Sequence, residues 1–125
     1  MRKLFLPLLA VSVLIACNSN SSSKETKADK ATDNTSNPDY QKGLDLVAKN
    51  KCMTCHAIDQ TITGPPYREV AKRYANRPDT IVQYLAHKVI NGGNGNWGEL
   101  YMTPNVGVSQ EDAEAMVKYI LLLNK

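Results

Sequence analysis

The segment Cys52-Met53-Thr54-Cys55-His56 constrains this chain more than any other feature. Two cysteines separated by two residues can each form a thioether bond to a vinyl group of one haem, and the histidine that follows can bind the iron. The sequence therefore predicts one covalently attached haem c, with Cys52, Cys55 and His56 as its attachment residues.

A C-x-x-C pair can also be half of a zinc site or a redox dithiol. A structural zinc site needs four ligands, and the chain offers only Cys17 and His87 beyond the motif. A redox dithiol of the thioredoxin kind belongs to a βαβ pattern, which the sequence does not show. Both alternatives are therefore weaker than haem attachment.

The first sixteen residues have the pattern of a secretory signal peptide. Arg2 and Lys3 precede an almost wholly apolar run over residues 4–16, which is short for a membrane span. The run ends in Leu14-Ile15-Ala16-Cys17, which resembles a bacterial lipobox. That resemblance implies cleavage before Cys17 and lipidation of Cys17. The alternative is an ordinary signal peptide that happens to contain a cysteine.

Residues 17–37 are expected to be the lipidated cysteine and a disordered polar tether. They are rich in Ser, Asn, Thr, Lys and Asp and have no apolar period, so they cannot bury enough surface to offset their ordering entropy. The protein is thus expected to be exported and held at a bacterial membrane, facing the periplasm or the cell exterior. A spacer without a required length is the alternative for the tether.

Residues 38–125 remain for one folded domain. A domain this short buries a limited share of its surface, and a covalently bound haem would stabilise it. The formal charge falls from +3 to +1 when Arg2 and Lys3 leave with the signal peptide. This charge gives no indication of nucleic-acid binding.

Periodicity predicts four helices and no strand, so the expected fold class is all-α. Asp79 and Ser109 are the expected N-caps of the last two helices, and Asp112 stands three residues after Ser109 as in a capping box. The four predicted helices span residues 39–49, 66–74, 79–91 and 109–123.

The connection from Gly92 to Val108 is long for a loop and carries aromatic residues, which favours a functional segment. It contains Met102, the candidate for the second axial iron ligand, because a thioether opposite a histidine raises the reduction potential. Three competitors are less suitable. Met53 lies within the attachment motif, Met116 lies on an apolar helix face, and His87 is expected at the surface.

The chain from about Pro38 onward resembles a class I cytochrome c of the short single-haem bacterial c-551/c-552 type. The order and spacing of several segments carry the resemblance. They are residues 52–59, Gly64-Pro65-Pro66-Tyr67, the run from Asn91-Gly92 to Trp97-Gly98, Met102-Thr103-Pro104-Asn105 and the last helix. The resemblance implies a cytochrome c fold, with about four helices packed around one haem.

The resemblance also implies roles for individual residues. His56 and Met102 would be the axial ligands, and the Pro65 carbonyl would accept a hydrogen bond from the His56 ring. Three further residues would contact the haem or its ligand: Asn105 would lie near the Met102 sulfur, and Trp97 and Lys88 would lie at a haem propionate. Gly43 and Tyr119 would pack where the first and last helices cross.

The implied function is that of a single-electron carrier rather than an enzyme, working as a monomer. Its expected partners are a quinol-oxidising complex and a terminal oxidase or reductase. One alternative is a haem enzyme or gas sensor with a labile methionine ligand, and another is a scaffold lipoprotein. The cations Arg68, Lys72, Arg73 and Arg77 are either a docking patch or an ordinary solvated surface.

Overall fold

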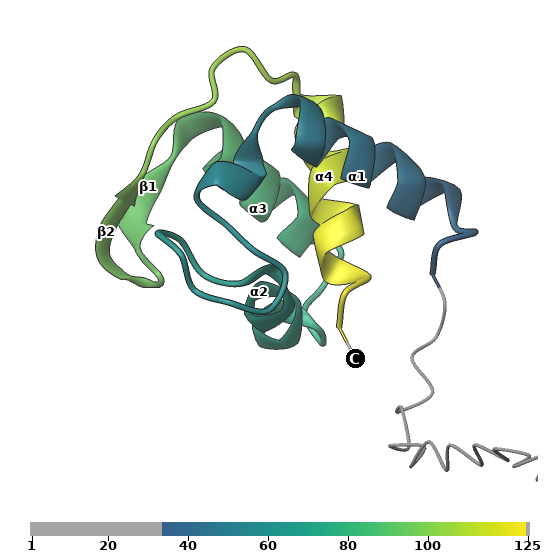
Figure 1. Ribbon diagram of the computed structural model, residues 1–125, viewed down its shortest axis with the longest axis horizontal. Helices are drawn as coiled ribbons and strands as arrows, with labels where there is room; N and C mark the ends of the chain where they lie inside the picture. The colour runs from purple at the N-terminus through teal and green to yellow at the C-terminus, as the bar shows by residue number, and fades with distance from the viewer. Residues whose placement is uncertain (1–33, 125) are drawn as a thin grey trace, which may run out of the picture.

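The computed structural model describes residues 34–124, so the expected signal peptide, Cys17 and most of the tether lie outside the described residues. Four helices dominate this part of the chain (Figure 1). The helices are α1 (Pro38–Lys49), α2 (Tyr67–Tyr74), α3 (Thr80–Asn91) and α4 (Gln110–Leu121), with a short 3-10 turn at Cys52–Thr54. The predicted bounds differ from these by one or two residues at most.

Side-chain caps set the beginning of two helices. Asn37 accepts a hydrogen bond from the Asp39 backbone N–H at 2.9 Å, and Pro38 occupies the first position of α1. Ser109 Oγ accepts from the Asp112 N–H at 3.1 Å, which confirms the cap predicted for α4. Asp79 precedes α3 as predicted, but its side chain makes no cap hydrogen bond because its backbone is already helical.

Helices α1 and α4 cross and pack directly against each other (Figure 1). A Cβ atom at Gly43 would collide with the Tyr119 Cβ and the Ala115 carbonyl oxygen, so only glycine allows this approach. Tyr119 is 1% exposed, and its ring meets that of Tyr40 edge-on with 5.0 Å between centroids. The packing role predicted for Gly43 and Tyr119 is confirmed.

The core consists of two buried clusters along α4, which contacts each of the other three helices. Met116 is 1% exposed in the larger cluster, which confirms it as a core residue, and His87 is exposed as expected. The larger cluster contains Val47, Tyr67, Ala71, Met116, Tyr119, Ile120 and Leu123; the smaller contains Ala86, Ala113 and Val117.

A small antiparallel hairpin follows α3, and the sequence did not predict it. Strand β1 (Gly93–Gly95) pairs with β2 (Gly98–Met102), with Gly93 opposite Met102 and Gly95 opposite Gly98. The sequence gives no sign of a strand here, because β1 consists of glycine and asparagine and lacks the alternation of apolar and polar residues that indicates a strand. The hairpin depends on the positive φ angles of Gly95 and Gly98, which only backbone geometry reveals.

Residues 34–37, which the sequence analysis placed in the tether, contact the helical domain. Asn34 Nδ2 donates to the Leu122 carbonyl at 2.8 Å, and Gln41 Nε2 donates to the Thr35 carbonyl at 2.7 Å. The chain therefore enters the domain beside the end of α4, on the side away from the hairpin (Figure 1). Within residues 34–124, no helix is long and apolar enough to cross a membrane.

A candidate haem-attachment site

The two motif cysteines lie on a tight turn directly after α1. Lys51 takes a left-handed conformation (φ 56°), and the 3-10 turn then begins at Cys52. The backbone N–H groups of Cys55 and His56 both donate to the Cys52 carbonyl, at 3.2 and 3.1 Å. Cys52 is half-buried, Cys55 is exposed, and both thiols are free.

The His56 ring is held in one orientation. Its Nδ1 lies 2.8 Å from the Pro65 carbonyl oxygen, which can only accept, so Nδ1 carries the proton and Nε2 keeps its lone pair. The ring stacks on Tyr67 at 5.1 Å between centroids with an angle of 18°. A Cβ atom at Gly64 would collide with the imidazole, so glycine is required there.

Burial controls the ionisation of the neighbouring groups. The pKa of the Cys52 thiol is raised by its burial. The pKa of Tyr67 lies well above its usual range, first because its hydroxyl is buried and second because the negative charge of an ionised Cys52 would be close by. Tyr67 is therefore a neutral hydroxyl beside the motif.

Met102 ends β2 and is half-buried. Gly92 (φ 68°) is buried against the segment that follows, and a Cβ atom there would collide with the Met102 carbonyl oxygen. Asn105 ties the same segment to α3: its backbone N–H donates to the Ile90 carbonyl and its Nδ2 to the Val89 carbonyl, both at 2.9 Å. The backbone around Met102 is thus attached to the last turn of α3.

Asn105, Lys88 and Trp97 are the residues predicted to lie near the haem or the Met102 sulfur, and each contacts other parts of the described chain. Asn105 Nδ2 donates also to the Thr103 carbonyl at 3.2 Å, so its amide serves backbone carbonyls on both sides of the loop. The Lys88 ammonium lies 5.9 Å from the centroid of the Tyr84 ring.

Trp97 lies in the hairpin turn, 39% exposed, with the Arg73 guanidinium 4.5 Å from its ring centroid. The sequence analysis did not foresee this pair, which joins α2 to the hairpin. No spacing rule links residues so far apart in the chain.

Two of the four cations that could form a docking patch have acidic partners. Arg68 Nε lies 2.5 Å from Asp59 Oδ1, and Arg68 also donates to the Leu123 carbonyl at 3.1 Å. Lys72 pairs with Glu69 at 3.0 Å. Two of the four charges are therefore already compensated by neighbouring carboxylates.

Sequence reasoning missed the site roles of Gly64, Gly92 and Tyr67. Gly64 and Tyr67 stand in the Gly-Pro-Pro-Tyr run that carried the resemblance, but their contacts with His56 depend on how residues 56–67 fold back. The signal for Gly92 was its place after a predicted helix, which indicates a helix end and not a contact with Met102.

The residues present fit a covalently attached haem. Two free thiols lie on one turn, one imidazole nitrogen is left available, and a half-buried thioether ends a strand that is attached to α3. Within residues 34–124, no group of three or more His, Cys, Asp and Glu side chains is arranged to hold a metal ion, which gives a zinc site no support.

Comparison with known proteins agrees with this reading. The family model described as cytochrome c matches residues 40–124. The chain is 41% identical over 83 residues to cytochrome c-552 of Nitrosomonas europaea, which covers 66% of this chain and 80% of that protein. It is 43% identical over 79 residues to cytochrome c-551 of Allochromatium vinosum, covering 62% and 82%.

Solved structures give the same result. The crystal structure of wild-type Nitrosomonas europaea cytochrome c552 matches with a TM-score of 0.61 at 41% identity, covering 65% of this chain and 99% of that one. The expected all-α cytochrome c fold and the single covalently attached haem c are confirmed, with the small hairpin as an addition to the four helices. Because the family model spans more than half of the sequence, the chain belongs to the cytochrome c family.

Proposed function

We propose that this protein, an electron-carrying c-type cytochrome that acts with redox partners, binds its haem iron through His56 and Met102 and does not act as an enzyme. The observation that carries the proposal is the 2.8 Å contact between His56 Nδ1 and the Pro65 carbonyl, which leaves Nε2 free to bind a metal. A haem enzyme or gas sensor is not favoured, because the relatives are cytochromes c-551 and c-552.

Cys52 and Cys55 would hold the haem through thioether bonds, and the bound iron would supply a reversible one-electron change. Pro65 keeps the His56 ring in one tautomer, while Gly64 and Tyr67 fix its plane. Because these contacts already orient the His56 ring, this side chain would need little rearrangement to bind the iron or to accommodate a change in its charge.

On the other side, Gly92 and Asn105 hold the backbone that carries Met102. Met102, supplied by this attached strand, would serve as the second protein ligand to the iron and would leave no open site for substrates or gases. Trp97 would donate its indole N–H to a haem propionate, Lys88 would lie near the same group as a point charge, and Asn105 would lie near the Met102 sulfur.

The Met102→Ala variant tests the ligand assignment. We expect the haem to stay attached, the far-red sulfur-to-iron charge-transfer band of the oxidised protein to vanish, and the reduced protein to bind carbon monoxide readily. Met53→Ala is the matched control, because Met53 lies exposed on the attachment turn. An unchanged Met102→Ala spectrum would show that Met102 is not the ligand.

For the chain as a whole, we propose a signal peptide over 1–16, a lipid on Cys17, a polar tether through residue 37 and a cytochrome domain over 38–125. The last tether residues, 34–37, lie against the domain. The lipobox-like run supports this division, as does the place of the other two cysteines in the proposed haem-attachment motif. The protein would then be an exported monomer held at a bacterial membrane, passing electrons from a quinol-oxidising complex to a terminal oxidase or reductase.

Cys17→Ser tests the anchor. We expect the variant to leave the membrane fraction with its haem spectrum unchanged, since two acyl chains are what makes such anchoring stable. Membrane retention of the variant at wild-type level would end the lipoprotein proposal. Stopped-flow oxidation of the reduced protein by candidate oxidases and reductases would then identify the acceptor.

A further inference from the structure

A groove of about 510 Å³, open to solvent, lies between the end of α2, the first turn of α3 and the hairpin. Arg73 and Arg77 line it together with the hydroxyl-bearing Tyr84 and Thr80 and the amide of Asn96. Among the described residues that line it there is no aspartate or glutamate. The charges facing this groove are therefore all positive.

Unlike Arg68 and Lys72 on α2, Arg73 near the end of α2 and Arg77 in the turn that follows have no ion-pair partner within residues 34–124. Arg73 is held over the Trp97 ring, and the Arg77 side chain makes no ion pair or hydrogen bond within residues 34–124. Both are exposed. The acidic residue nearest to Arg77 in sequence is Asp79, which makes no ion pair in the described chain and does not line the groove.

The α3 and hairpin residues of the groove offer a further donor. Tyr84 on α3 accepts a hydrogen bond from Asn96 Nδ2 of the hairpin at 2.7 Å. Because the phenol oxygen accepts this bond, its own O–H remains available to donate to a ligand. Two guanidinium groups and one phenol form a set of donors that suits a carboxylate.

We propose that this groove docks an acidic loop of a redox partner, with one of its carboxylates seated between Arg73 and Arg77. A single small anion would not fill about 510 Å³, whereas a loop with its backbone would, and its apolar atoms could lie on Tyr74 and Tyr84. The hairpin that forms one wall also carries Met102, so docking would bring the partner near the metal site. The choice of a redox partner rests on the proposed function.

A peptide titration tests the docking site. Hexaglutamate is added to the reduced, ¹⁵N-labelled holoprotein at low ionic strength, and the indole N–H of Trp97 gives one assignable signal because it is the only tryptophan. We expect saturable shifts of this signal and of residues 73–84. Arg77→Gln should weaken binding about threefold or more, as for one exposed charge contact, and Arg77→Lys should weaken it less.

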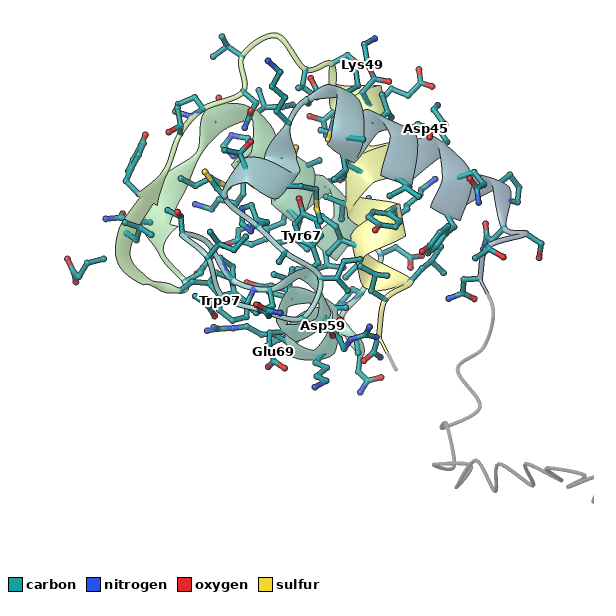
Figure 2. The ribbon with its side chains drawn as sticks, in the orientation of Figure 1. Asp45, Lys49, Asp59, Tyr67, Glu69 and Trp97 are labelled. Atoms are coloured by element: carbon teal, nitrogen blue, oxygen red, sulfur yellow. The ribbon has the colours of Figure 1, made fainter. Side chains whose placement is uncertain are left out.

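Lys49→Gln is the matched control, because it removes the same charge from an exposed lysine without an ion pair. Figure 2 shows Lys49 on the opposite side of the molecule from Trp97. Equal weakening by Lys49→Gln and Arg77→Gln would mean that only net charge matters and would overturn the proposal. So would identical shifts caused by inorganic phosphate at the same ionic strength, since that result describes a small-anion site.

The haem spectrum and the reduction potential are measured for every variant. If the peptide fails to bind while both remain normal, the docking proposal is wrong and the electron-carrier function stands. If the spectrum itself departs from histidine–methionine ligation in the wild type, the ligand proposal fails independently of the groove.

Discussion

Three neighbouring residues orient the ring of His56, the side chain that we propose binds the haem iron. Pro65 accepts from one ring nitrogen, Tyr67 lies against the ring, and Gly64 leaves room for it. None of these neighbours is a ligand, yet each removes a degree of freedom from the imidazole. A side chain oriented in this way loses little entropy when it binds a metal.

Gly64→Ala should disturb this site. The new Cβ would overlap the imidazole and push it away from the Pro65 carbonyl, so we expect a lower yield of haem-loaded protein. The loaded fraction should lose about 1–3 kcal/mol of unfolding free energy, as for other overpacked sites. Denaturant unfolding followed at the haem absorbance measures both. Gly107→Ala, where the added Cβ meets nothing within 4 Å, should match the wild type.

The Arg68–Asp59 pair predicts a pH effect. The Arg68 hydrogen bond and charge lower the pKa of Asp59, so the pair contributes stability above the ordinary pKa of a carboxyl. That contribution disappears as the pH falls through the lowered pKa. In Arg68→Gln the pKa of Asp59 should rise toward its ordinary value, measured by NMR of the side-chain carbonyl carbon. Lys42→Gln, which removes the partner of Glu111 instead, should leave the Asp59 titration unchanged.

At the level of elements, two glycines determine which segments lie together. Gly43 lets α1 and α4 cross closely, and Gly92 lets the end of α3 contact the Met102 segment. The first contact builds the core, and the second attaches the proposed ligand strand to a helix. The hairpin and Asn105 then complete the loop that the sequence presented as irregular.

Gly43→Ala should destabilise the fold although alanine favours helix. The propensity gain is about 1 kcal/mol, whereas the new methyl would meet the Ala115 carbonyl and the Tyr119 Cβ, neither of which can move aside alone. We expect a net loss of about 1–2 kcal/mol in urea unfolding. Ala48→Gly is the control, because at this exposed position of α1 the change in unfolding free energy reflects helix propensity alone. A Gly43→Ala protein more stable than the wild type would contradict the close crossing.

At the scale of the whole molecule, the described residues form a small four-helix domain with two small buried clusters. No disulfide links Cys52 and Cys55, the two cysteines within residues 34–124. A covalently attached group can stabilise a domain whose buried clusters are this small. The attached haem would stabilise this domain, with the proposed thioethers at Cys52 and Cys55 directly after α1.

A Cys52→Ala/Cys55→Ala chain should therefore lose most of its helix signal in far-ultraviolet circular dichroism. Without thioethers the haem is not retained, and the remaining core is too small to offset the conformational entropy of the chain. Cys17→Ser keeps both attachment cysteines and should retain the wild-type signal. Cooperative thermal unfolding of the double variant with wild-type helix content would show that the domain folds without haem.

The sequence by itself determined the haem motif, the four helices and their order, because these depend on residues close together in the chain. Spacing within Cys52–His56 and apolar periodicity are local properties, and helix bounds were predicted within one or two residues. The cap at Ser109 followed from a short sequence pattern, and the packing role of Gly43 followed from the family resemblance.

Only the tertiary structure decided the rest, because it depends on pairs that are distant in sequence or on backbone angles. The hairpin needs glycines at positive φ, the Asn34–Leu122 hydrogen bond joins the two ends of the domain, and Arg73 meets Trp97 across two elements. Arg68 and Lys72 carried the same formal charge as Arg77 in the sequence. In the structure Arg68 and Lys72 pair with carboxylates, whereas Arg73 and Arg77 line the groove, a difference that no count of charges could reveal.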